Sequence, residues 1–249
     1  MSRHIILLRH GQSQWNLENR FTGWTDVDLT AKGREEAAAA GRLIRDAGLK
    51  PQTYFTSVLR RAIHTLQIAA AVMEREWVPV VKDWQLNERH YGALQGLNKS
   101  DTAAKYGREQ VHQWRRSFDA LPPLLTPDDP RWPGNDERYN RLTADELPLA
   151  ESLQDTIARV RCCWEELIVP AIHAQGDVMI VAHGNSLRGI IKHLKGISDE
   201  AISEFNLPTA VPYVFGFDDG LNYVKDYFLG DPGEIARLMD AVASQGRKG

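Results

Sequence analysis

The chain has 249 residues, 43% of them hydrophobic, which is enough to bury a substantial core. Thirty Lys and Arg residues against 33 Asp and Glu residues give a net charge of −3. This balance excludes the broad basic field that drives binding to nucleic acids or anionic membranes, so any anion site must be local. The two cysteines, Cys162 and Cys163, are adjacent, which excludes a disulfide framework and fits a reducing compartment.

The first half of the chain alternates strand and helix patterns. A short β-branched run, Ile5–Leu8, predicts a buried strand but is too short for a signal peptide or a membrane span. After Thr30, small and apolar residues fall on one helical face, formed by Ala37, Ala40, Gly41, Ile44 and Ala47. A strand at Thr53–Thr56, a helix capped by Ser57 and a third strand at Val78–Val81 follow. Such alternation predicts a mostly parallel sheet covered by helices.

The second half resumes this pattern after an irregular segment. Six of the twelve prolines lie between Leu121 and Pro148, so we interpret residues of about 95–150 as an insertion. A helix over 153–168, a strongly apolar strand at Val178–Ala182 and a helix from Ser186 come next. The chain then shows strand patterns at 213–217 and 223–228, and Asp231-Pro232 opens a last helix.

These patterns predict one three-layer α/β domain over residues 1–249. We expect a mostly parallel central sheet flanked by helices, with the insertion covering the active site. The C-terminal residues 244–249 are small or polar, and we expect them to form a flexible tail.

Two predicted strands end in the same dipeptide, His-Gly. His10-Gly11 follows the first strand, and His183-Gly184 follows the most apolar one. The carboxyl edge of an open α/β sheet is where ligands bind, so the two imidazoles are expected to face one pocket. The glycines are expected to let the backbone approach a ligand. A single histidine there would more often be structural, but two in the same context favour a site.

Several segments carry a resemblance to a known family. Arg9-His10-Gly11-Gln12-Ser13 resembles the signature of the histidine phosphatase superfamily, whose members use the histidine as a nucleophile that carries a phosphoryl group. Within it, segments 15–24, 56–62, 86–92, 96–99 and 206–209 closely resemble the 2,3-bisphosphoglycerate-dependent phosphoglycerate mutases. The resemblance extends from the first strand to Leu229-Gly230-Asp231.

The resemblance implies a role for each matching residue. His10 would be the phosphohistidine and Glu88 the proton donor and acceptor, while Arg9, Arg61 and His183 would stabilise the charge on the transferring phosphoryl group. Nearby cations would also keep the imidazole neutral. The residues implied in substrate binding are Arg9, Ser13, Asn16, Thr22, Gly23, Arg61, Glu88, Arg89, His90, Tyr91, Lys99, Arg115, Arg116, Gly184 and Asn185.

The sequence departs from the family pattern at two positions. Gln12 stands where many of these mutases have Glu, and Ala210 stands where Gly is frequent; we expect the first to be tolerated and the second to affect backbone strain. The bisphosphoglycerate mutases typically differ at Ser13 and at Thr22-Gly23, so their presence favours a monophosphoglycerate enzyme.

The activity implied is interconversion of 3-phosphoglycerate and 2-phosphoglycerate, primed by 2,3-bisphosphoglycerate and independent of metal. A phosphatase on the same fold, a catalytically silent phosphoprotein-binding domain and a metal enzyme are the alternatives. The clamp formed by Lys99, Arg115 and Arg116 argues against a phosphatase, and the presence of both histidines argues against a catalytically silent domain. The sequence has no spacing typical of metal ligands, which argues against a metal enzyme. We expect a cytoplasmic homodimer or homotetramer with no nucleic-acid or membrane partner.

Overall fold

The computed structural model describes residues 3–218 and 220–243, and at its centre lies a six-stranded sheet. The strands follow the order β3-β2-β4-β1-β5-β6. They span Arg3–Arg9 (β1), Thr53–Thr56 (β2), Val80–Lys82 (β3), Val178–Ala182 (β4), Tyr213–Phe217 (β5) and Tyr223–Phe228 (β6). All six coincide with predicted strand segments to within two residues at each end.

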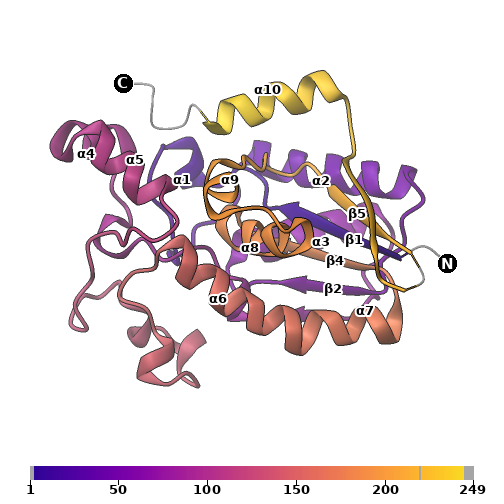
Figure 1. The fold of residues 1–249 in the computed structure, drawn as a ribbon, viewed down its shortest axis with the longest axis horizontal. Helices are drawn as coiled ribbons and strands as arrows, with labels where there is room; N and C mark the ends of the chain where they lie inside the picture. Colours follow the sequence, from indigo (N-terminus) through magenta and orange to yellow (C-terminus); the bar gives the residue numbers. More distant parts are fainter. Residues whose placement is uncertain (1–2, 219, 244–249) are drawn as a thin grey trace.

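The sheet is mixed, with parallel pairing at its centre. β1 with β4, β2 with β4 and β2 with β3 pair in parallel, whereas β5 pairs antiparallel with both β1 and β6. Figure 1 shows the central strands pointing toward the side of the molecule where α4 (Lys99–Tyr106) and α5 (Arg108–Arg116) lie. The prediction of an α/β fold with a mostly parallel sheet is confirmed.

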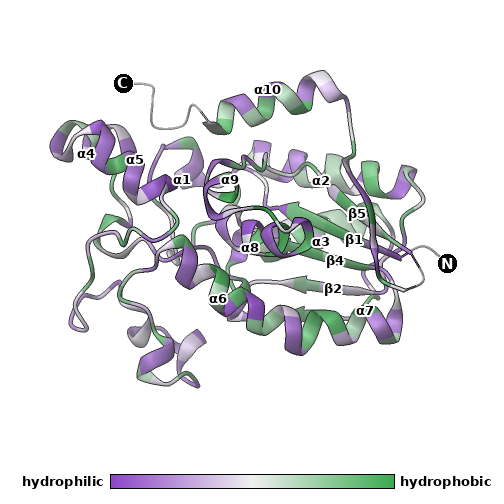
Figure 2. Ribbon diagram, viewed as in Figure 1, coloured by the Kyte–Doolittle hydropathy of each residue, from purple (hydrophilic) through white to green (hydrophobic). Residues whose placement is uncertain are grey.

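Helices cover both faces of the sheet. On one face Leu7, Phe55 and Ile180 join a core formed with α6 (Leu153–Cys163) and α8 (Gly184–Lys195). On the other, Leu8 and Val181 join a core formed with α2 (Ala31–Asp46) and α3 (Arg60–Val72). Successive side chains of a strand point to opposite faces of the sheet, so a strand that is buried on both faces has a continuous run of apolar residues. Figure 2 shows these central strands in green.

Three helices pack next to the sheet, and two of them, α3 and α8, carry residues of the site described below. They span Ala31–Asp46 (α2), Arg60–Val72 (α3) and Gly184–Lys195 (α8). Two predicted starts were wrong. The N-cap of α3 is Leu59 rather than Ser57, whose hydroxyl is hydrogen-bonded to His183 and accepts the Leu59 N–H. Helix α8 begins directly after His183, and Ser186 is its third residue, where the Ser186 side chain accepts the His183 N–H.

The predicted helix over 153–168 continues further than expected. It consists of α6 (Leu153–Cys163), a π-helical segment η6 (Trp164–Ile168) and α7 (Val169–Gln175). Pro170 has no N–H for the carbonyl four residues earlier, and the chain widens into the π-helical turn just before it. The chain therefore runs helically from Leu153 to Gln175.

The segment over residues 95–150 is more regular than expected. It contains α4 (Lys99–Tyr106), which the Asn98 side chain caps, and α5 (Arg108–Arg116), and Gly107 at φ +89° separates the two helices. Their apolar periodicity is weak, since α5 buries only Val111, and Figure 2 shows both helices mostly in purple. The Pro-rich part holds only the short 3₁₀ turns η3 (Pro133–Asn135), η4 (Glu137–Tyr139) and η5 (Ala144–Glu146).

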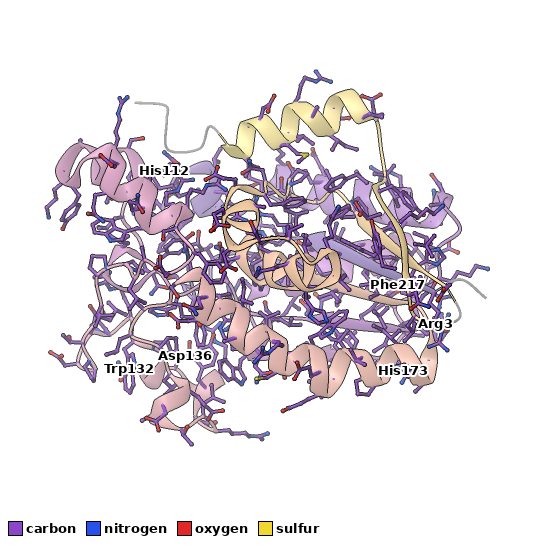
Figure 3. The ribbon with its side chains drawn as sticks, in the orientation of Figure 1. Arg3, His112, Trp132, Asp136, His173 and Phe217 are labelled. Carbon is purple, nitrogen blue, oxygen red and sulfur yellow. The ribbon has the colours of Figure 1, made fainter. Side chains whose placement is uncertain are left out.

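The remaining elements are short or peripheral. They are α1 (Gln14–Leu17), η1 (Trp84–Leu86), η2 (Gly92–Leu94), α9 (Asp199–Glu204) and α10 (Pro232–Ala243). In Figure 3, Arg3 and Phe217 mark one end of the sheet, and Trp132 and Asp136 lie in the segment beyond the other. The predicted tail at 244–249 lies outside the described residues. Among the described helices, none has the length and apolar character that crossing a bilayer requires.

Candidate active site

The pairing of β1 with β4 brings the two histidines together. Arg9 is in register with Ala182, and the N–H of His10 donates to the carbonyl of Ala182 at 3.0 Å. The rings of His10 and His183 lie edge to face with their centroids 5.0 Å apart. Both imidazoles are buried, as the matched His-Gly dipeptides predicted for one shared site.

His10 is held with a free nitrogen. Its Nδ1 lies 2.7 Å from the carbonyl of Gly11, and a carbonyl can only accept, so Nδ1 carries the proton and Nε2 the lone pair. Burial, followed by the charges of Arg61 and Arg9, holds the pKa of His10 well below its usual range. At neutral pH His10 is therefore an uncharged imidazole, suited to nucleophilic attack through Nε2.

Three buried nitrogens next to His10 have no hydrogen-bond partner among the described residues. These three buried donors are Nε of Arg9, Nε of Arg61 and Nδ1 of His183. Other atoms of the same side chains are held: Arg9 donates to the carbonyl of Leu207, Arg61 to those of Gly23 and Thr25, and Nε2 of His183 lies 2.7 Å from Oγ of Ser57. An unpaired buried N–H costs about 1–3 kcal/mol, so the arrangement suits an anion that pairs with it.

The carboxylate of Glu88 lies beside these residues, and one of its oxygens accepts three hydrogen bonds. Its Oε1 accepts from the backbone N–H of Arg89 and from both the N–H and the Nδ2 amide of Asn185, at 2.9–3.0 Å. Burial works to raise the pKa of Glu88, but these hydrogen bonds and the charges of Arg9 and Arg61 together lower it. A Cβ at Gly184 would lie 3.7 Å from both Oε2 of Glu88 and Nε of Arg9, so this glycine lies against both groups.

A cavity opens to solvent beside these residues. Its cationic lining residues are Arg9, Arg20, Lys99, Arg115, Arg116 and Arg188, and its one acidic lining residue among those described is Glu88. Burial, followed by the charges of Arg115 and Arg9, lowers the pKa of Lys99 to about 7. The cavity is thus a local anion trap in a chain of slightly negative net charge.

Most residues implied by the family resemblance meet at this cavity. Asn16, Thr22, Gly23, Tyr91, Gly184 and Asn185 line it together with the cations named above. His10, Arg61 and His183 are buried beside it: His10 follows the lining residue Arg9, His183 precedes the lining residue Gly184, and Arg61 holds the Gly23 carbonyl. Arg89 is also buried, with its guanidinium 4.6 Å from the ring of Tyr91 and unpaired at Nε and Nη1.

Three of the residues expected at the site lie outside the cavity lining and contact other parts of the protein. Ser13 caps α1 and donates its hydroxyl to the side chain of Asn16. His90 is buried away from the cavity lining, with Nδ1 accepting from Gly92 N–H and Nε2 3.3 Å from the Gln95 amide. Gly11 packs against α2, where a Cβ would lie 2.2 Å from the carbonyl of Gly33, so close packing alone requires a glycine there.

Sequence reasoning missed five lining residues: Arg20, Phe21, Arg188, Leu207 and Val242. Arg188 could have been found, since three residues after Asn185 on a helix is the same face. No sequence pattern indicated that Val242, near the end of α10, would line the same cavity as residues of α1 and α5.

The two departures from the family pattern have structural counterparts. Gln12 lies outside the cavity lining, where its side-chain oxygen accepts from the Thr30 hydroxyl at 2.9 Å. Ala210 has φ +50°, the left-handed region that favours glycine, and its N–H donates to the carbonyl of Arg9. The expectation of backbone strain at Ala210 therefore agrees with its conformation.

Within residues 3–218 and 220–243, no three His, Cys, Asp or Glu side chains form a group that could hold a metal ion. Metal independence stays a prediction. Cys162 is exposed and Cys163 buried, and both are free thiols.

This geometry agrees with a comparison against protein families. The model of the histidine phosphatase superfamily (branch 1) matches residues 5–229, and the chain belongs to this superfamily. Two similar relatives are the 2,3-bisphosphoglycerate-dependent phosphoglycerate mutases of Dichelobacter nodosus and Bacteroides fragilis. The first is 59% identical over 98% of this chain and 99% of the relative, and the second 58% identical over 99% of each.

Solved structures share the fold at lower identity. A protein described as mycobacterial hydrolase 1 has a TM-score of 0.70 and 23% identity, covering 93% of this chain and 100% of that chain. A mycobacterial glucosyl-3-phosphoglycerate phosphatase has a TM-score of 0.68 and 21% identity, covering 91% and 97%. Both likenesses show the common architecture.

Proposed function

We propose that the protein interconverts 3-phosphoglycerate and 2-phosphoglycerate through a phosphohistidine at His10, primed by 2,3-bisphosphoglycerate. The observation that carries this proposal is the set of three buried donors next to a neutral His10, at one end of a cationic cavity. The names of the relatives at 58–59% identity support the same activity.

The residues present fit an anion with two phosphates and a carboxylate. The three buried donors would hold the phosphoryl group that reacts. Arg89, Tyr91, Lys99, Arg115 and Arg116 would hold the carboxylate and the second phosphate, because guanidinium groups bind such oxygens in a bidentate manner. When bound, 2,3-bisphosphoglycerate supplies the phosphoryl group that loads His10.

The reaction at the protein follows from the free atoms of two side chains. In the phosphorylated enzyme, the bond from Nε2 of His10 to phosphorus breaks as a substrate hydroxyl oxygen attacks. Oε2 of Glu88 takes the hydroxyl proton, because Oε1 is already saturated by three donors. The reverse step re-forms the N–P bond and returns the proton to the leaving oxygen.

The buried donors lower the barrier without taking part covalently. In the transition state of the transfer, negative charge is spread over the three equatorial oxygens of the phosphoryl group. Fixed N–H groups in a site shielded from water stabilise this charge with little reorganisation. Nδ1–H of neutral His183 is one such donor, provided the Ser57 hydroxyl donates to Nε2. In that arrangement, the hydrogen bond to Ser57 would keep the proton of His183 on Nδ1.

We also propose a cytoplasmic location and phosphoglycerates as the small-molecule partners. Assembly into a homodimer or homotetramer is part of the same proposal and rests on the family resemblance.

The central test is a mutase assay by ³¹P NMR, with and without 2,3-bisphosphoglycerate and with excess EDTA. We expect isomerisation that depends on the primer and survives EDTA, and a phosphoprotein that is labile to acid and stable to alkali. His10→Ala is expected to abolish both. His173→Ala, on the exposed surface of α7, is the matched control and should retain full activity.

Three outcomes would contradict the proposal. Full activity in His10→Ala would show that His10 is not the nucleophile. A strict metal requirement would indicate another mechanism. Free phosphate as the main product would favour the phosphatase alternative.

A further inference from the structure

Arg188 contacts the proposed acid–base group only through another side chain. It lies in α8 and lines the cavity, but it is 7% exposed and committed to two acceptors. Its Nε donates to the carbonyl of Phe205 at 2.8 Å, and its Nη1 donates to Oδ1 of Asn185 at 3.1 Å. No role follows for it from the family resemblance.

The contact with Asn185 determines how that amide is oriented. A guanidinium can only donate, so the amide end that faces Arg188 must be the carbonyl oxygen. The NH₂ end then faces Oε1 of Glu88 at 2.9 Å. A flipped amide would place an N–H against the guanidinium and an oxygen against the carboxylate, and both contacts would be repulsive.

We infer that Arg188 is a positioning residue for Glu88, acting through the amide of Asn185. This inference rests on the proposed function, since it concerns the proton transfer assigned to Glu88. Because Arg188 maintains the amide donor, Oε1 of Glu88 stays saturated and Oε2 remains the oxygen that exchanges a proton with the substrate. Arg188 therefore maintains one of the three hydrogen bonds to Oε1 without touching Glu88.

Other charged and titratable groups also act on Glu88. They are Arg9 from β1, Arg61 from α3, Lys99 from α4, and Tyr91 from the loop that carries Glu88. A test must therefore separate the hydrogen-bond relay from the simple loss of one positive charge.

The experiment titrates Glu88 directly, by ¹³C NMR of carboxyl-labelled glutamate in the full-length protein. In Arg188→Met we expect the titration midpoint of Glu88 to rise by about one pH unit, a tenfold change in its proton affinity. The acid limb of the kcat profile should move with it, while KM changes little. Lys192→Met is the matched control, because Lys192 also tethers α8 to the following segment through the carbonyl of Ile197.

A double-mutant cycle separates the relay from charge. In an Asn185→Ala background, Arg188→Met is expected to shift the midpoint no further. An additive shift would overturn the proposal, because it would show that Arg188 acts by its charge alone. A raised KM with an unchanged midpoint would instead assign Arg188 to substrate binding, and would also overturn it.

Two checks keep the test decisive. Arg188→Lys keeps a donor for Asn185 and should restore the midpoint, and a shift as large as in Arg188→Met would contradict the relay. Where Arg188→Met does not fold, Arg188→Gln replaces it with the same expectation. The NMR midpoint needs no activity, so failure of the proposed mutase function and failure of this inference give different results.

Discussion

A buried ion pair ties α6 to the loop that carries Glu88, and its removal gives the most direct test of how this site is supported. Nε and Nη2 of Arg159 donate to the two carboxylate oxygens of Glu151 at 2.6 and 2.8 Å. The same guanidinium donates to the carbonyls of Gln85, Asn87 and Glu88. The two side chains are only 9% and 6% exposed, so water cannot replace a lost partner.

Arg159→Met keeps the length of the side chain but leaves the Glu151 carboxylate without its cation. Removing one partner of a buried pair costs about 3–5 kcal/mol. For a denaturant slope of about 2–3 kcal/mol per molar, the urea midpoint should fall by about 1.5 M. Activity should also fall, because the backbone of Glu88 loses one of its donors.

The assay is equilibrium urea unfolding, followed by circular dichroism, for Arg159→Met, Glu151→Leu and the double variant. We expect each single change to be costly and the double variant to be more stable than the sum predicts, by about 2–3 kcal/mol. Arg161→Met is the control: its partner Glu165 is 63% exposed, so the cost should stay below about 1 kcal/mol. A loss below 1 kcal/mol in Arg159→Met, or strict additivity, would refute this account.

Three further predictions concern charge and backbone conformation. Burial and nearby guanidinium groups lower the pKa of His90 to about 3, so as pH falls below about 6.5 the unfolded chain binds a proton that the folded chain does not. The contribution of His90 to stability should then fall by about 1.4 kcal/mol per pH unit, and His90→Gln should reduce the slope by that amount in urea unfolding at pH 7, 6 and 5, while the slope from His10 and His183, whose pKa values burial also lowers, remains; an unchanged slope would contradict the assignment. Lys99, with a pKa of about 7, loses its charge as pH rises, so affinity for 3-phosphoglycerate measured by calorimetry should weaken up to about tenfold from pH 7 to 9. This dependence should disappear in Lys99→Met and persist in Lys105→Met, and its persistence in Lys99→Met would disprove it. Exposed Glu74 has φ +56° just after α3, so Glu74→Gly should stabilise the protein by about 1 kcal/mol in thermal or urea unfolding, whereas Glu76→Gly should not; equal effects would rule out strain as the cause.

The strands and the histidine pair were predictable because their signals are local. β1 and β4 are short apolar runs, and a residue that directly follows such a strand must lie at the edge of the sheet. That placed His10 and His183 together without any knowledge of the fold's details. Helix starts were less predictable: Ser57 is a typical cap residue, but its hydroxyl is engaged by His183 from a distant part of the chain.

The part of the cavity lined by α4 and α5 could not be predicted from local sequence patterns, because it depends on contacts between distant parts of the chain. Helices α4 and α5 have little apolar periodicity, since they bury few residues, yet they carry Lys99, Arg115 and Arg116 to the cavity. The family resemblance included His90 because it lies within the matching segment 86–92, but both of its ring nitrogens are hydrogen-bonded within the protein. Only the three-dimensional arrangement separates residues that face the cavity from residues that support it.

The position of β4 between β1 and β2 has a consequence for synthesis on the ribosome. β1, β2 and β3 all leave the ribosome before β4, and the partner on the other side of β1, β5, follows later still. Until residues 178–182 emerge, β1 therefore lacks both of its neighbours in the sheet, β4 and β5. The nascent chain then exposes unpaired apolar strand edges, which favour aggregation. We expect chains arrested before β4 to depend on chaperones and to lack any assembled site, because the last of its two histidines arrives with that strand.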